Sequence, residues 1–83
     1  MTEPLNQNPY APITCARYSE YEVAILRRRK LHLRWHIANV LYDQVVLPLD
    51  LDTINHEEFL TCRTVSGEIL IIRLDRIQKM EPV

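Results

Sequence analysis

The chain reads LHLRWHI over Leu31–Ile37, so apolar and polar side chains alternate without a break. A period of two is typical of a β-strand that buries one face and leaves the other in water. Trp35 is in phase with the two leucines, which predicts that it belongs to the core. The wet face of the same strand then carries three basic or ionisable side chains, those of His32, Arg34 and His36.

The residues before this strand have a helical spacing instead. A helix is predicted to begin at Thr14 or Cys15 and to end near Arg29, with Thr14 as its N-cap. Apolar residues recur along it at intervals of three and four and form one stripe: Cys15, Tyr18, Tyr21 and Ile25. This stripe predicts that the helix packs against the sheet.

Several short strands separated by turn signals follow Leu31–Ile37. Further strands are predicted over 40–47, 57–64, 68–74 and 77–80, with 49–53 as a bent or edge strand because Pro48 limits the pairing beyond it. The turns between strands are expected at Ala38–Asn39, Asn55–His56 and Ser66–Gly67. One helix followed by such strands predicts an α+β fold in which the helix packs on a small, bent antiparallel β-barrel.

Size and composition limit the class of protein. The 83 residues are enough for one domain, predicted over 10–83, with a flexible tail over 1–9. No signal peptide and no membrane-spanning run is evident, so a cytoplasmic location and two buried, reduced thiols are expected. We find no phosphate-binding glycine loop, nucleophile elbow or metal-ligand spacing, and we expect neither an enzyme nor a bound metal or cofactor.

Two end motifs carry a resemblance to a known family. The C-terminal motif is IRLDRI, over Ile72–Ile77, and Glu58–Leu60 adds a short match between the ends. The N-terminal motif consists of Tyr10, Pro12, Ile13, Cys15, Tyr18, Glu22 and Ala24. Together these motifs resemble the small bacterial Rho-binding antiterminators, the Rof or YaeO family, over nearly the whole chain.

The resemblance implies an Sm-like fold and a non-enzymatic, cytoplasmic modulator of transcription termination. Members of that family bind the terminator Rho and block its access to RNA. Because the RNA-binding surface of Rho is basic, such an inhibitor is expected to present carboxylates and aromatic groups to it. A monomer is expected, and the candidate partner-binding residues are Tyr18, Glu20, Glu22, Asp50, Asp52, Glu57 and Glu58.

A second interpretation remains open. The stretch from Val45 to Ile77 also resembles the barrel of WYL-type regulatory domains, which are usually fused to DNA-binding domains. An Sm-like module could bind RNA or another ligand through a basic patch, although charges at a helix C-terminus also simply stabilise the helix dipole. The residues of this alternative site are Arg27, Arg28, Arg29, Lys30, His32, Arg34 and His36.

Overall fold

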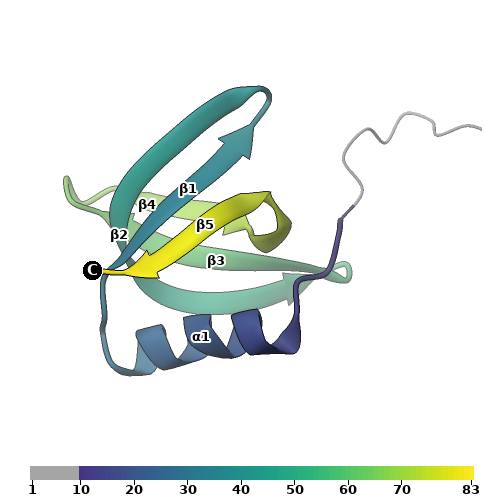
Figure 1. Ribbon diagram of the computed structural model, residues 1–83, viewed down its shortest axis with the longest axis horizontal. Helices are drawn as coiled ribbons and strands as arrows, with labels where there is room; N and C mark the ends of the chain where they lie inside the picture. Colours follow the sequence, from purple (N-terminus) through teal and green to yellow (C-terminus); the bar gives the residue numbers. More distant parts are fainter. Residues whose placement is uncertain (1–9) are drawn as a thin grey trace, which may run out of the picture.

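The computed structural model describes residues 10–83; the predicted tail over 1–9 lies outside the described residues. One helix accompanies a single antiparallel sheet of five strands in the order β4-β3-β2-β1-β5 (Figure 1). The elements follow one another as α1 (Cys15–Leu26), β1 (Leu31–Ile37), β2 (Val40–Ile54), β3 (Glu57–Thr64), β4 (Ile69–Arg73), the 3-10 helix η1 (Leu74–Arg76) and β5 (Ile77–Pro82).

Strand β2 joins the two halves of the sheet. Its first half pairs with β1 as far as Val46, and its second half pairs with β3 from Val46 to Ile54. The register shifts between Pro48 and Asp50. Proline has no N–H to donate, so the ladder is interrupted there and the strand bends. The prediction that Pro48 would limit the pairing beyond it was therefore wrong. A β-bulge accommodates the proline, and β2 continues to pair with β3 as far as Ile54.

The α+β class is confirmed, but the predicted barrel is not closed. Strands β4 and β5 stand at the two ends of the strand order, and no hydrogen-bonded pairing joins them within residues 10–83. Helix η1 connects these two edge strands directly. The sheet is therefore curled, with α1 lying along one side of it and the β1–β2 hairpin rising on the opposite side (Figure 1).

Helix α1 begins as predicted and ends three residues early. The side chain of Thr14 accepts a hydrogen bond of 3.1 Å from the backbone N–H of Arg17, which confirms the N-cap. The last helical residue is Leu26, because Arg28 adopts the left-handed conformation with a φ of 53°. No helix formed by residues 10–83 has both the length and the apolar character that a membrane crossing requires.

The core lies between α1 and the concave side of the sheet. Leu33 and Trp35 of β1 are at most 2% exposed, which confirms the strand's predicted phase. Tyr21 and Ala24 are the buried residues of α1. Cys15 is exposed, contrary to the expectation of two buried thiols, because it lies about 120° around the helix from Tyr21.

The second cysteine, Cys62, is fully buried in β3. Its burial raises the pKa of the thiol to about 11, so the reactive thiolate form is scarce at neutral pH. Both cysteines are free in the structure. The two thiols therefore differ strongly in accessibility.

Two of the three predicted turns are two-residue hairpin loops with positive φ at both positions. The values are 50° at Ala38 and 68° at Asn39, and 51° at Asn55 and 67° at His56. This geometry matches the right-handed twist of the flanking strands and favours asparagine and glycine. Ala38 and His56 depart from this preference, and at Ala38 the Cβ crowds the neighbouring carbonyl with no polar side chain to form a compensating local hydrogen bond.

Replacing Ala38 with glycine is therefore expected to stabilise the protein by about 1 kcal/mol. The matched control is Ala16→Gly on α1, where the same change should destabilise by about 1 kcal/mol because glycine loses more backbone entropy in a helix. Urea denaturation followed by circular dichroism measures both effects. A loss of stability in both variants would contradict the strain at Ala38.

Candidate functional site

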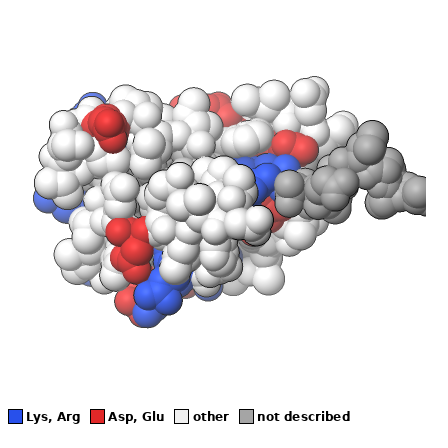
Figure 2. Space-filling model, turned by 90° about the horizontal axis from the view of Figure 1, so that it is seen from above, with Lys and Arg blue, Asp and Glu red and all other residues white. Residues whose placement is uncertain are grey.

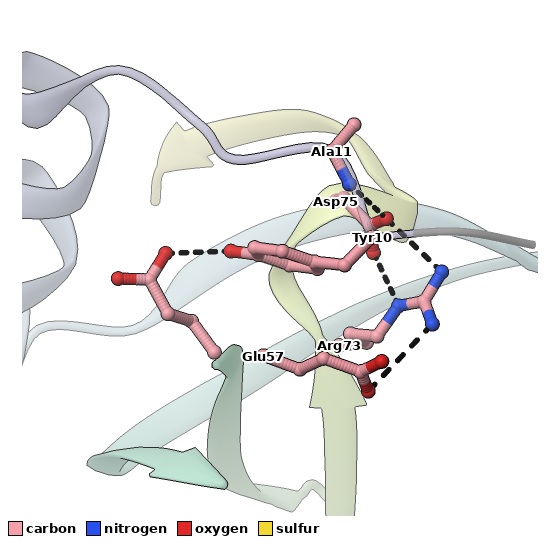
Figure 3. Close-up of polar contacts among 6 residues, drawn as sticks. Tyr10, Ala11, Glu57, Arg73 and Asp75 are labelled. Atoms are coloured by element: carbon pink, nitrogen blue, oxygen red, sulfur yellow. Dashed lines mark hydrogen bonds and ion pairs between the residues drawn. The ribbon is translucent and has the colours of Figure 1, made fainter. Parts of the chain in front are cut away.

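The segment before α1 is fastened to the strands by two hydrogen bonds. The Tyr10 hydroxyl donates to Oε1 of Glu58 at 2.5 Å, and the Ala11 backbone N–H donates to Oδ2 of Asp75 at 2.9 Å. Figure 3 shows the Tyr10 side chain reaching across toward the strands from this segment. The two end motifs of the sequence are thus in direct contact in the fold.

Arg73 lies at the centre of this contact. Its Nε and Nη2 donate to the two carboxylate oxygens of Asp75 at 2.6 and 3.0 Å, and its Nη1 lies 3.8 Å from Oε1 of Glu57. The guanidinium carbon is also 5.7 Å from the centre of the Tyr10 ring (Figure 3). A bidentate pair whose side chains are only 12% and 7% exposed is well shielded from water. Arg73 and Asp75 therefore form an intramolecular ion pair within the C-terminal motif.

The environment of Tyr10 disfavours its ionised form. Burial has the largest effect, followed by the hydrogen bond to Glu58, and both raise the pKa of the phenol above its usual value. A phenolate could not donate to Glu58 and would repel it. The contact therefore requires the protonated tyrosine.

Tyr18, one turn into α1, lies half-buried in an acidic surrounding. Burial raises the pKa of its phenol, and nearby carboxylates raise it further. These carboxylates come from three different elements and are, in decreasing order of effect, those of Glu58, Glu22, Asp52 and Asp50. We call these four acids and Tyr18 the Tyr18 surface. Its chemistry is that of an aromatic group within a field of negative charge.

Five of the seven predicted partner-binding residues are therefore Tyr18 and the four acids whose charges act on it, and two have other positions. Glu20 pairs with Arg17 at 3.3 Å on α1 and lines a hollow of about 320 Å³ between the helix and β5. Glu57 contacts Arg73. Within residues 10–83, no three His, Cys, Asp or Glu side chains are grouped so that they could hold a metal ion.

The wet face of β1 is neutralised by one carboxylate. Nη2 of Arg34 lies 3.2 Å from Oδ2 of Asp43, and His32 contacts the other oxygen of the same group. These contacts, the hydrogen bond from His32 first, lower the pKa of Asp43. His36 instead contacts the side chain of Gln78. These side chains of the predicted basic patch are therefore engaged within the sheet.

The Arg27–Lys30 run leads from α1 into β1, where the fold adds a cation that the sequence did not indicate. Arg63 of β3 borders one hollow together with Arg28 and another together with Lys30. Arg63 is 33 residues after Lys30 in the chain, so the sequence pattern gives no indication that these two cations are neighbours. Only the register of β3 beside β2 could have suggested their proximity.

The side of the molecule opposite α1 carries little charge. Figure 2 views this side from above: most of the surface is uncharged, and the acidic and basic groups form small patches, some of which adjoin. The exposed apolar side chains of the β1–β2 hairpin are Ile37, Val40, Leu41 and Tyr42. The residues of the Arg27–Lys30 run lie outside this hairpin.

One comparison with known proteins gives a match in fold. The chain is similar to part of the proteasome accessory factor B/C (PafBC) of Arthrobacter aurescens, with a TM-score of 0.74 and 23% sequence identity. The match covers 89% of this chain and 12% of that one, so it concerns the fold alone. No family model matches the sequence, and no curated protein matches it.

Replacing Tyr10 with phenylalanine is expected to destabilise the protein by about 1 kcal/mol at neutral pH, because the hydrogen bond to Glu58 is lost. The folded pKa of Tyr10 is raised above the unfolded value of about 10, so its contribution is complete below pH 10 and is lost as the pH rises through the folded pKa. The stability difference between wild type and Tyr10→Phe should therefore shrink above pH 10.

Urea denaturation between pH 7 and pH 11 measures this difference. Tyr42→Phe is the control, since the Tyr42 hydroxyl makes no hydrogen bond within residues 10–83. A difference between wild type and Tyr10→Phe that stays constant across the whole range would refute the assignment.

Proposed function

We propose that this protein binds the transcription terminator Rho and reduces Rho-dependent termination by blocking access of RNA to it. The proposal rests on the Tyr18 surface, where an aromatic group is set among four carboxylates. A basic, RNA-binding surface on a partner is complementary to such a group in both charge and stacking chemistry.

The fold supports the same proposal. The resemblance to Rho-binding antiterminators implies an Sm-like arrangement, and a helix followed by a bent five-stranded antiparallel sheet with a 3-10 turn before the last strand is compatible with it. The two motifs that carry the resemblance also meet through Tyr10, Arg73 and Asp75. Those residues have a structural role in our proposal, because they fix the segment that enters α1.

The position of the carboxylates suggests how RNA would be excluded. Asp50 and Asp52 belong to β2, Glu58 to β3 and Glu22 to α1, so the sheet and the helix together hold the charges in fixed relative positions. Carboxylates held in this way can occupy the cationic sites that RNA phosphates otherwise fill. Inhibition would then be competitive and would require no covalent step.

A double charge reversal tests the proposal. Glu22→Lys combined with Asp52→Lys is expected to weaken binding to purified Rho at least tenfold, equivalent to about 1.4 kcal/mol, because both side chains are exposed and would contact the basic surface in our proposal. Calorimetric titration at low salt measures the affinity, and a transcription assay with Rho measures read-through of a Rho-dependent terminator.

Glu68→Lys provides a control with half the charge change, since Glu68 is exposed but is not among the carboxylates around Tyr18. This variant should keep the affinity of the wild type. The proposal fails if the wild-type protein shows no binding to Rho at micromolar concentrations, or if the control weakens binding as much as the double variant does.

A further inference from the structure

Arg28, the second residue after α1, has a strained backbone conformation. Arg28 has a φ of 53°, and the two N–H groups that close the helix end are those of Arg28, to Ile25 O at 3.2 Å, and Arg29, to Ala24 O at 2.9 Å. Glycine or asparagine normally fills the left-handed position of such a helix end. Strained non-glycine residues cluster at functional sites, which makes the surroundings of the Arg28 side chain relevant to function.

The Arg28 side chain borders a hollow of about 400 Å³ between the end of α1 and the bend of β2. Arg63 of β3 borders the same hollow, and Pro48 and Leu47 also line it. Pro48 is buried and Leu47 is half-buried. This hollow is therefore lined by apolar residues and by two arginines.

A second, smaller hollow adjoins Arg63. Its volume is about 180 Å³, and Lys30, Arg63 and Leu47 are among the residues that line it. Arg63 is thus shared between the two hollows, with Arg28 bordering one and Lys30 the other. Among residues 10–83, no carboxylate forms an ion pair with any of these three cations.

We propose that Arg28, Lys30 and Arg63 bind the phosphate backbone of single-stranded RNA, with unpaired bases packed against the apolar residues that line the two hollows. Guanidinium groups pair with phosphate oxygens and also stack on bases. A duplex keeps its bases paired and could not insert them, and unpaired bases are ordinarily presented by RNA. This site is separate from the Tyr18 surface, since Arg28 follows the C-terminal end of α1 and Tyr18 lies in its first half.

Fluorescence anisotropy with a labelled twelve-nucleotide oligo-U RNA, in the absence of Rho, tests this site. Three phosphate contacts predict a slope of about −2 for the logarithm of affinity against that of salt concentration, which is roughly a 20-fold loss between 50 and 200 mM salt. Because the protein is used alone, failure here is distinguishable from failure of the Rho-binding proposal.

Two variants give independent readouts. Arg63→Glu should weaken RNA binding at least tenfold and make the salt slope less steep. Arg28→Gly removes a cation but relieves the strained backbone, so its thermal midpoint should equal or exceed that of the wild type while RNA affinity falls. If Arg28 had only a structural role, its replacement would not lower RNA affinity while stability is kept. A fall in RNA affinity without a fall in the thermal midpoint therefore indicates a binding role.

The control is Lys79→Glu, which makes the same charge change on β5, where Lys79 pairs with Glu81 at 3.6 Å. It should leave RNA affinity within twofold of the wild type. The proposal is overturned if the wild-type protein does not bind oligo-U at 50 mM salt, if Arg28→Gly binds as tightly as wild type, or if Lys79→Glu is as weak as Arg63→Glu. Equal competition by oligo-dT or by polyglutamate would also overturn the assignment to RNA.

Discussion

The bend of β2 at Pro48 is the constraint on which the remaining structure depends. A proline in the middle of a paired strand removes one ladder hydrogen bond, and the register shift before Asp50 accommodates that loss. The same strand can then pair with β1 on one side of the bend and with β3 on the other. Helix α1 packs along the second half of β2, so the bend also determines which residues lie beside the helix.

Both charged surfaces follow from that arrangement. Asp50 and Asp52 come directly after the bend, and their charges raise the pKa of Tyr18 in the first half of α1, whereas Leu47 and Pro48 line a hollow with Arg28, which follows the C-terminal end of α1. The net charge of the protein is only −1, yet acidic residues act on the first half of α1 and basic residues follow its C-terminal end. Partners of opposite charge could be bound at the two ends without competing for the same side chains.

Local patterns in the sequence predicted much of the fold because the period of two, the N-cap and the turn residues each depend on neighbouring positions. The turns at Ala38–Asn39 and Asn55–His56 were located in this way. The end of α1 was missed, since nothing in the sequence marks Arg28 as the residue that would adopt a left-handed conformation. Arg63 was missed for a different reason, because its proximity to Arg28 and Lys30 arises from strand register rather than from spacing along the chain. The acids around Tyr18 were predicted as candidates, but their meeting on one surface required the fold.

The contrast between the two cysteines has a practical consequence. Cys62 is enclosed in β3, and its raised pKa leaves little thiolate, whereas Cys15 is exposed at the first position of α1, three residues before Tyr18. A maleimide dye added to the unaltered protein would thus attach at one place, adjacent to the aromatic group. The fluorescence of this dye would change when a partner binds at the N-terminal end of α1, and no cysteine would have to be introduced or removed.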